Sequence, residues 1–268
     1  KHKNIPVMYY ISPQLWAWHK SRVNLIRKYI DRMVVLFDFE REFYRKYGVA
    51  ADFVGHPLLD VVKPSENRDT FRKSLGANDK KLIGLLPGSR PQEIDRVFPA
   101  MVQSIETLQA SIGPVVVVAS CAPELDETLL KQHTHGTDIQ VLRGKTYDIM
   151  AYCDALAVTS GTATLEAGIS GTPMVVVYKT SLLTYLIGRA VVNVPDIGLI
   201  NIVAGRRVVP ELGQNEATPE NIAAVLHKFC TNPELYADVK DALSHAKSKL
   251  GEPGASERAA AIAVEMLG

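Results

Sequence analysis

The sequence predicts an α/β protein built from two domains with parallel sheets. Short apolar runs rich in β-branched residues alternate with helical patterns along the whole chain. Because these runs are almost continuously apolar, they are typical of parallel strands that helices cover on both faces. A polar stretch that contains proline, at 61–68, divides the alternation into two series. Each series therefore predicts one Rossmann-like domain.

The expected elements, taken in order, support this division. The apolar runs predict strands at Val7–Ile11, Met33–Phe37, Asp52–Val54, Leu82–Leu86, Val115–Ala119, Ile139–Leu142, Ala155–Val158 and Met174–Tyr178. The segments between them have helical patterns, at Ser21–Ile30, Glu40–Tyr47, Pro91–Ala110, Pro123–Gln132, Tyr147–Tyr152 and Ala163–Ser170.

The two series differ in completeness. Residues 1–60 contain three of the predicted strands, which is too few for a usual doubly wound sheet. We expect them to be the C-terminal part of a first, incomplete domain, and the lack of an initiator Met leads us to expect missing sequence before Lys1. Residues 61–250 are predicted to form a complete second domain. A stretch with glycine and proline then separates a final helix within 251–268.

Composition narrows the function classes. The 268 residues carry a formal net charge of +1, which gives no general attraction to nucleic acid. Cys121, Cys153 and Cys230 are far apart and lack CxxC spacing. We therefore expect reduced thiols in a cytosolic protein, not a disulfide framework or a metal site. No apolar run reaches the length of a membrane span.

The stretch Ser160–Glu166 is the most informative motif. It lies between an apolar run and a helical pattern, which predicts a turn at the carboxyl end of a strand, where open α/β sheets bind ligands. Gly161 permits close approach to the backbone, and free amides around Thr162 and Thr164, where the next helix starts, favour a diphosphate. Glu166 is expected within reach of a ribose diol. The alternative is an ordinary turn capped by Ser or Thr.

A second turn of this kind follows the first strand of the second domain. It contains Gly88, Ser89 and Arg90, and Glu93 lies at the start of the helix that follows. We expect this turn to face the same crevice, and the charged, forked guanidinium of Arg90 suits a phosphate. The alternative is a surface arginine in an ordinary turn. The pattern is neither GxGxxG nor a Walker loop, which lowers the odds for NAD or ATP.

Two further residues of the second domain are candidates. Gly144 follows the predicted strand Ile139–Leu142, and its backbone could form the edge of a base site. The alternative is a plain turn. Asn201 is a candidate sugar contact, and the alternative is an Asn that caps a helical turn.

The first domain offers an aromatic cluster of candidates. Trp16, Trp18 and His19 follow the first strand, and His56 ends the third. All four are candidates for lining a cleft on the acceptor side. The alternative for the two tryptophans is packing in the core or at its rim. The alternative for His56, which lies just before the polar stretch at 61–68, is packing at a hinge.

An apolar stripe with basic flanks follows the last predicted strand. Lys179 and Arg189 are the flanking cations. The stripe indicates either core packing or contact with a membrane surface. Its residues are Leu182, Leu183, Leu186, Ile187, Ala190 and Val191.

Seven segments, taken in order, form a more specific pattern: Ser12–Trp18, Phe53–Leu58, Leu86–Glu93, Thr159–Glu166, Asn201–Arg206, Val209–Leu212 and Gly254–Ser256. The pattern resembles the lipid-A-disaccharide synthase family of inverting glycosyltransferases, and the resemblance covers the entire chain. It implies the GT-B fold, in which two Rossmann-like domains are followed by a last helix that crosses back to the first domain. Ala255–Leu267 is the candidate for that helix.

The resemblance also implies a reaction. The family transfers 2,3-diacylglucosamine from UDP to the 6-hydroxyl of 2,3-diacylglucosamine 1-phosphate, which gives the β-1,6 disaccharide of lipid A biosynthesis. No metal or other cofactor is expected, because Ser160–Thr164 and Arg90 would stabilise the leaving UDP. Since both substrates are lipids, we expect a cytoplasmic protein, peripheral on the cytoplasmic face of the inner membrane of a Gram-negative cell. A homodimer is among the expected assemblies, and nucleic acid is not an expected partner.

The chain departs from the family in two places. In the family an Asp early in the N-terminal domain acts as the general base, and no segment of this sequence matches it. We therefore expect the base upstream of Lys1, and we expect this chain not to turn over by itself. The second departure is Ile200, where the family commonly has Pro before the Asn.

Two other functions remain open. A UDP-sugar epimerase of the same fold would also use a Ser-Gly loop and a Glu that binds UDP. The chain could instead be a UDP-binding fragment that is inactive alone. The products discriminate the two enzymes, since one releases UDP with an acylated disaccharide and the other forms an epimerised sugar nucleotide.

Overall fold

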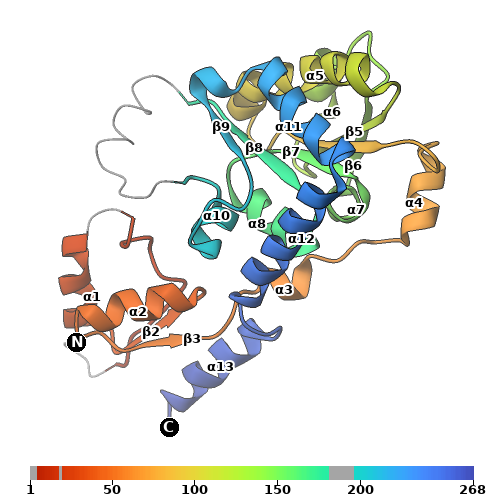
Figure 1. Cartoon of the computed structure of the whole chain (residues 1–268). Coiled ribbons are helices and arrows are strands. Elements are labelled where there is room, and N and C mark those ends of the chain that lie inside the picture. Colours follow the sequence, from red (N-terminus) through yellow and green to blue (C-terminus); the bar gives the residue numbers. More distant parts are fainter. Residues whose placement is uncertain (1–4, 18–19, 181–195) are drawn as a thin grey trace. The chain divides into compact units, whose positions relative to one another are not determined.

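The computed structural model describes residues 5–17, 20–180 and 196–268 (Figure 1). The described residues form two compact units. The first contains the residues up to Val61 together with Lys247–Gly268. The second contains the described residues from Val62 to Ala246.

The first unit holds a small parallel sheet. Within the described residues it has three strands in the order β1-β2-β3, which are Met8–Tyr10, Arg32–Val35 and Ala51–Phe53. The helices α1 (Val23–Tyr29) and α2 (Asp38–Lys46) connect them. Because each strand is followed by a crossover, the carboxyl ends of all three meet at one edge. Buried side chains from strands and helices form the core: Leu15, Val23, Ile26, Met33, Val35 and Tyr44.

The last helix, α13 (Ala255–Glu265), belongs to the first unit. The amide of Gly254, just before it, donates to both carboxylate oxygens of Asp60 at 3.0 Å. Nε of Arg258 donates to the carbonyl of Val54 at 2.9 Å. Gly254 has φ +91°, a conformation that favours glycine. These contacts attach the helix to the segment that follows β3.

The second unit holds a larger parallel sheet, whose described strands have the order β6-β5-β4-β7-β8-β9. The predicted α/β class with parallel sheets is therefore confirmed. The strands are β4 (Leu82–Leu86), β5 (Val116–Cys121), β6 (Gln140–Arg143), β7 (Ala155–Thr159), β8 (Met174–Tyr178) and β9 (Glu211–Gly213). Residues of β4, β7 and β8 are almost entirely buried, as their continuous apolar sequences predict.

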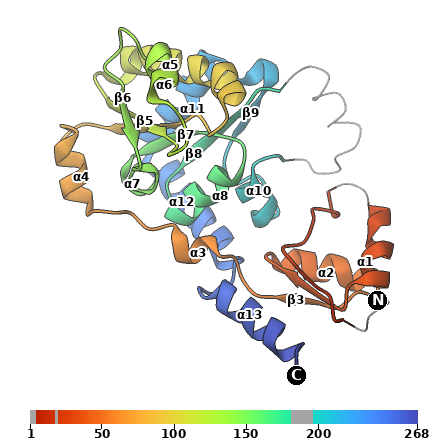
Figure 2. The same ribbon diagram turned by 180° about the vertical axis from the view of Figure 1, so that it is seen from behind.

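Two groups of helices cover this sheet. Helix α5 packs against α11, and α8 packs against α7 and α10. Figures 1 and 2 show the two groups on opposite faces of the sheet. The described helices of this unit are α4 (Arg68–Ser74), α5 (Pro91–Ile112), α6 (Glu127–His133), α7 (Thr146–Tyr152), α8 (Thr162–Ser170), α10 (Leu199–Ala204), α11 (Pro219–Thr231) and α12 (Pro233–Ser248).

The polar stretch at 61–68 has a structural role in the second unit. Asp148, which is buried, accepts hydrogen bonds from the amides of Ser65 and Glu66 at 2.8 and 3.1 Å. The Ser65 hydroxyl donates to the same carboxylate at 2.8 Å. The amides of Ser65 and Glu66 lie outside any strand or helix, so they need another hydrogen-bond acceptor. The carboxylate of Asp148 supplies it for both.

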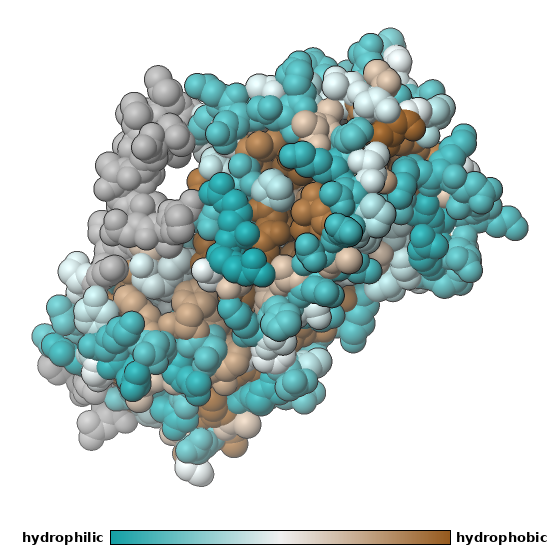
Figure 3. All heavy atoms as spheres, viewed as in Figure 1, coloured by the Kyte–Doolittle hydropathy of each residue, from teal (hydrophilic) through white to brown (hydrophobic). Residues whose placement is uncertain are grey.

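The surface gives one finding that bears on membranes. Among the described residues no helix is both long enough and apolar enough to cross a membrane. On the face drawn in Figure 3, hydrophobic residues show in patches between hydrophilic ones, as they do on most folded proteins. The apolar stripe at 182–191 lies outside the described residues.

Candidate functional site

The two turns predicted to bind phosphate lie beside each other. Strands β4 and β7 are parallel neighbours, with Leu86 beside Val158, so the turns that follow them share the carboxyl edge of the sheet. Gly88 has φ +100°, and a Cβ added to it would lie 3.3 Å from the Glu93 carboxylate and 3.6 Å from the Thr159 side chain. The first turn therefore passes directly over the end of β7.

The turn after β7 leads into a helix whose first turn has no side-chain cap. Gly161 is the N-cap of α8 with φ 149°, no side-chain cap bond is formed, and no acidic residue lies in the first turn. A Cβ added to Gly161 would have nothing within 4 Å, so open space lies next to it. The amides of Thr162 and Ala163 have no carbonyl one turn earlier in the helix, and together with the helix dipole they favour an anion at this position.

Thr159 supplies a second sign of a ligand at this edge. Its side chain is 6% exposed, and Oγ1 has no hydrogen-bond partner in the part of the chain that the structure describes. A buried hydroxyl without a partner costs about 1–3 kcal/mol. A bound polar group is one way to recover that cost.

The other polar side chains of the turn are already engaged. Thr164, fully buried, donates to the Gly161 carbonyl at 2.8 Å and accepts from the Leu199 amide at 3.0 Å. Thr164 therefore shapes the turn and has little capacity left for a ligand. Ser160 donates its hydroxyl hydrogen to the Ile197 carbonyl at 3.5 Å, a long bond that a closer partner can replace.

Arg90 is an exposed charge at the site. Its side chain is 79% exposed and pairs with Glu93 at 2.8 Å, while Ser89 beside it is exposed. An exposed pair of this kind contributes about 0–1 kcal/mol. The guanidinium can therefore exchange Glu93 for a phosphate at little cost.

Glu166 lies on α8 and is half-buried. It accepts a hydrogen bond from the Tyr147 hydroxyl at 3.2 Å. Burial raises the pKa of Glu166, and the bond from Tyr147 partly opposes that rise. The pKa of Tyr147 is raised to about 12, first by burial and then by the nearby carboxylate. Tyr147 stands at the start of α7, beyond Gly144 (φ +72°), so the turn after β6 reaches Glu166 through this side chain.

Tyr147 is a residue that sequence reasoning did not select. It was expected only as the first residue of a helix. The available signal was its place, since it lies in the first turn of α7, directly after the turn at Gly144 and at the same carboxyl edge of the sheet as Ser160.

The interpretation of Asn201 as a sugar contact does not fit the geometry. Asn201 is 1% exposed and lies inside α10. Its amide nitrogen donates to the Val209 carbonyl at 2.9 Å and to Glu211 at 2.8 Å. Its oxygen accepts from the amides of Val208 and Val209 at 2.8 and 3.0 Å. Every hydrogen-bonding group of the side chain is used, so Asn201 fastens α10 to the segment before β9.

The capping alternative for Asn201 is also wrong, because Asn201 lies within α10 and its side chain bonds to Val208, Val209 and Glu211 instead of to the start of the helix. The buried carboxylate of Glu211 accepts from the amides of Ile197 and Gly198, both at 2.9 Å. Gly198 is the N-cap of that helix. Asn201 lies one turn further on and holds Glu211 in place.

In the first unit, the carboxyl edge of the small sheet carries an aromatic cluster. Trp16 packs edge-on against Phe39 at 5.1 Å between ring centroids, and Phe39 stacks on Phe37 at 5.4 Å. The Phe37 ring lies 5.1 Å from the ring of His56. The structure thus brings Trp16 and His56 into one cluster, while Trp18 and His19 lie outside the described residues.

The buried carboxyl group of Glu40, which the sequence did not reveal, is hydrogen-bonded to Trp16 of this cluster. Glu40 is 3% exposed and accepts from the Trp16 indole at 3.2 Å and from the Phe37 amide at 3.3 Å. Burial raises its pKa from 4.5 to about 7, although these hydrogen bonds oppose the rise. Its position in the first turn of α2 was the available signal, because a Glu there often bonds back to the N-cap amide.

His56 has the contacts of a packing residue. It is buried, and its Nδ1 accepts from the Leu58 amide at 3.2 Å. Its backbone amide donates to the Leu250 carbonyl at 2.9 Å. Burial lowers the pKa of His56 to about 4, so the imidazole is neutral near pH 7. These contacts favour the packing alternative for His56 over the lining of a cleft.

Comparison with known proteins identifies the relatives of the chain. A family model described as lipid-A-disaccharide synthetase matches residues 1–266. Lipid-A-disaccharide synthase of Syntrophus aciditrophicus is 46% identical over 271 aligned residues, which cover 100% of this chain and 71% of that protein. The synthase of Geobacter metallireducens is 44% identical with the same coverage. The chain thus spans about 71% of the length of these relatives.

Solved structures share the fold at low sequence identity. A putative UDP-N-acetylglucosamine 2-epimerase from Listeria monocytogenes is similar with a TM-score of 0.64 and 14% identity, over 96% of this chain and 66% of that chain. WaaG, a glycosyltransferase involved in lipopolysaccharide biosynthesis, is similar with a TM-score of 0.53 and 17% identity, over 86% and 62%. These likenesses confirm the predicted type of fold.

Proposed function

The chain belongs to the lipid-A-disaccharide synthase family, and from this premise we propose that it takes part in one glycosyl transfer. The donor is UDP-2,3-diacylglucosamine, and the acceptor is the 6-hydroxyl of 2,3-diacylglucosamine 1-phosphate. The structural observation that supports the proposal best is the start of α8, which has no side-chain cap. The Thr159 hydroxyl, which has no hydrogen-bond partner among the described residues, lies at the end of the strand before it. Both lie at the edge where parallel sheets bind nucleotides.

The diphosphate of the donor is placed at the start of α8. Amides of Thr162 and Ala163 face a developing negative charge there, and Arg90 can leave Glu93 to join them. The leaving UDP gains negative charge as the sugar departs. Groups that bind that charge more tightly in the transition state accelerate the reaction.

The nucleoside is placed between α8 and the turn after β6. Glu166 accepts hydrogen bonds from the ribose hydroxyls, and Tyr147 holds the carboxylate in position at 3.2 Å. The exposed backbone at Gly144 borders the base. Burial of Glu166 strengthens such bonds, because water competes less there.

The first unit is proposed to serve the acceptor. Trp16 is half-buried in an aromatic cluster, which suits an apolar ligand on one side of the ring. His56 belongs to the same cluster, with its ring 5.1 Å from that of Phe37. Its low pKa makes it a weak base, so we do not assign proton removal from the acceptor to it.

The proposal also covers the cofactor requirement, the location and the partners of the protein. The protein acts without a metal or other cofactor, as a peripheral protein at the cytoplasmic face of the inner membrane, where both lipid substrates reside. A homodimer is the proposed assembly, and nucleic acid is not a partner. Vesicle flotation tests the membrane part, and sedimentation equilibrium tests the dimer.

Calorimetric titration with UDP tests the nucleotide site. Arg90→Ala should weaken binding by about 1.5–3 kcal/mol, because a charge-assisted contact is lost. Glu166→Gln should weaken uridine and UDP alike. Lys228→Gln, an exposed cation on α11, is the control and should bind as the wild type does. Unchanged affinity in both site variants would contradict the placement of UDP.

The products separate this proposal from its alternative. A transferase supplied with both diacylated sugars releases UDP together with an acylated disaccharide, which we expect once this chain is joined to the N-terminal part of a longer relative. A UDP-sugar epimerase would instead produce an epimerised sugar nucleotide without an acceptor. The second candidate is kept because an epimerase is among the structures that share the fold.

A further inference from the structure

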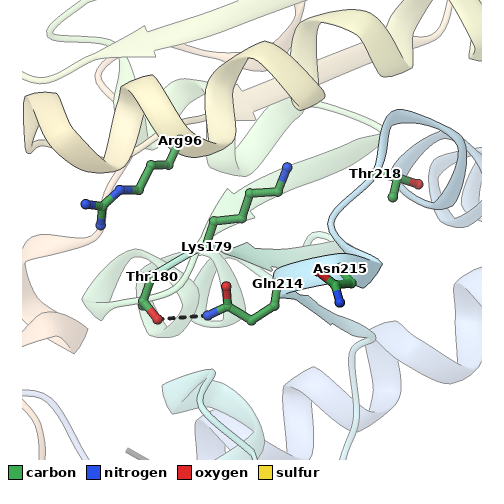
Figure 4. A pocket seen from close by; sticks show the side chains of 6 residues that line it. All are labelled: Arg96, Lys179, Thr180, Gln214, Asn215 and Thr218. Atoms are coloured by element: carbon green, nitrogen blue, oxygen red, sulfur yellow. Dashed lines mark hydrogen bonds between the residues drawn. The ribbon is translucent and has the colours of Figure 1, made fainter. Parts of the chain in front are cut away.

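The second unit contains a polar cavity of about 510 Å³ that is lined by none of the residues assigned above to the nucleotide site. Figure 4 shows it between α5, the ends of β8 and β9, and the start of α11. Its volume is in the range of small-molecule sites, about 300–1,000 Å³. The lining residues are Arg96, Lys179, Thr180, Gln214, Asn215 and Thr218.

Two strands approach each other closely beside the cavity, directly before the lining residues Lys179 and Gln214. Tyr178 of β8 pairs with Gly213 of β9, and a Cβ added to Gly213 would lie 2.3 Å from the Tyr178 ring. Glycine at this position lets β9 lie close to this ring without a shift of the Tyr178 side chain. The next residue, Gln214, has φ +51°, which is uncommon for a side chain other than glycine or asparagine. Its amide group is hydrogen-bonded to the Thr180 hydroxyl at 2.8 Å.

A strained non-glycine residue at a cavity is a sign of function. Such conformations cost about 1–3 kcal/mol and persist where the surrounding structure holds them. Gln214 and its neighbour Asn215 both line the cavity, and Figure 4 shows the Gln214 amide directed at the Thr180 hydroxyl. This side of the cavity is therefore polar.

The charge of the cavity is positive. Arg96 reaches it from α5 and Lys179 from the end of β8 (Figure 4). Neither side chain has a hydrogen bond or an ion pair with any residue that the structure describes. The acids beside Arg96 are already paired, since Glu93 pairs with Arg90 and Asp95 with His133. Two cations without acidic partners in one polar cavity favour an anionic ligand.

The cavity lies next to the proposed diphosphate site. Val177, two residues before Lys179, pairs with Thr159 at the end of β7. Arg96 lies about 9 Å along α5 from Arg90, at 1.5 Å of rise per residue. A long substrate held at the start of α8 can therefore extend into the cavity.

We propose that Arg96 and Lys179 bind a phosphoryl group of a substrate in this cavity. The proposal rests on the proposed function for the identity of that substrate. A phosphoryl group reaches the cavity from either of two sources, the diphosphate of the sugar nucleotide or the phosphomonoester of a sugar 1-phosphate. Gln214, Asn215 and Thr218 supply neutral hydrogen-bonding groups for its oxygens or for the attached sugar.

Calorimetry with three soluble probes tests the cavity. The probes are UDP, uridine and glucosamine 1-phosphate, and the proteins are the wild type, Arg96→Gln, Lys179→Gln and the control Lys228→Gln. Each cavity variant should weaken binding of a phosphate-bearing probe about tenfold, because one charge-assisted contact is lost. Uridine binding should not change. Lys179→Arg keeps the charge and should restore most of the affinity.

The results with the three probes distinguish the two sources of the phosphoryl group, and they separate the cavity proposal from the nucleotide-site proposal. Weaker UDP binding assigns the diphosphate to the cavity, and weaker glucosamine 1-phosphate binding with unchanged UDP assigns the sugar phosphate. If both variants bind both phosphate probes as the wild type does, or if the wild type binds neither, the cavity proposal is overturned. Loss of uridine binding in Glu166→Gln would still support the nucleotide site. Absence of uridine and UDP binding in the wild type, with glucosamine 1-phosphate lost in the variants, would overturn the nucleotide site and keep the cavity.

Discussion

At the scale of single residues, buried polar side chains decide which candidates can meet a ligand. Arg90 is exposed and weakly paired, whereas Asn201 has no free hydrogen-bonding group. The sequence identified both as polar residues of loops or turns. It could not distinguish them, because the partners of Asn201 come from the segment before β9 and depend on tertiary packing.

Asn201→Ala therefore tests a structural role. The substitution leaves the Glu211 carboxylate and the amides of Val208 and Val209 without their partner. We expect the free energy of unfolding to fall by about 2–4 kcal/mol, since several buried groups lose bonds. Urea denaturation measures this loss. An unchanged stability together with a selective loss of UDP affinity would restore the sugar-contact interpretation.

Glu40 predicts how stability in the first unit depends on pH. Its pKa is about 7 in the folded protein and near 4.5 in the unfolded chain, so the folded state binds this proton more tightly. Its contribution to stability is full below the unfolded pKa and is lost as the pH rises through the folded pKa. The contribution is on the order of 3 kcal/mol.

Denaturation at about pH 5 and about pH 8 measures this contribution. The free energy of unfolding of the wild type should fall over the interval, and Glu40→Gln should remove most of the fall. Glu42→Gln is the matched control, because Glu42 is an exposed residue of α2 that pairs with Arg45. The same pH dependence in Glu40→Gln as in the wild type would contradict the assignment.

At the scale of elements, short apolar strands were the most predictable features. The predicted bounds of β4 and β8 agree with the structure, because both are buried, β-branched or apolar throughout and end at turns. The helix expected from Pro123 begins at Glu127, since Asp126 caps it by accepting from the Thr128 amide at 3.0 Å. Strand β9 was missed because three residues carry too little periodicity to be recognised.

Two glycines, Gly161 at the N-cap of α8 and Gly168 within the helix, should respond differently to substitution by alanine. Gly161 has φ 149° and open space around its Cβ position, whereas a Cβ on Gly168 would lie 2.4 Å from the Ile200 side chain. Gly161→Ala should cost about 1–3 kcal/mol of backbone strain and weaken UDP binding, because the helix start is displaced. Gly168→Ala should cost about 1–3 kcal/mol through overpacking of α8 against α10.

Calorimetry and thermal denaturation, run on both variants, separate these effects. Gly168→Ala that still folds should bind UDP with an affinity near that of the wild type. If the two variants lose UDP affinity equally, the turn at Gly161 has no special part in binding.

At the scale of the whole molecule, the motifs indicated the family more directly than the composition did. The ordered segments from Ser12 to Ser256 predicted the lipid-A-disaccharide synthase family, and the match over residues 1–266 confirms it. Composition and charge only excluded broad classes. The cavity at Arg96 and Lys179 and the carboxyl group of Glu40 depend on which elements meet, so no local pattern could reveal them.

The central claim is that UDP binds at the carboxyl edge of the second unit, and a crystal structure of the protein with UDP tests it most directly. The account predicts the diphosphate at the amides of Thr162 and Ala163, with Thr159 and Arg90 in contact and the ribose hydroxyls on Glu166. UDP bound elsewhere, with the start of α8 occupied only by water, would contradict it.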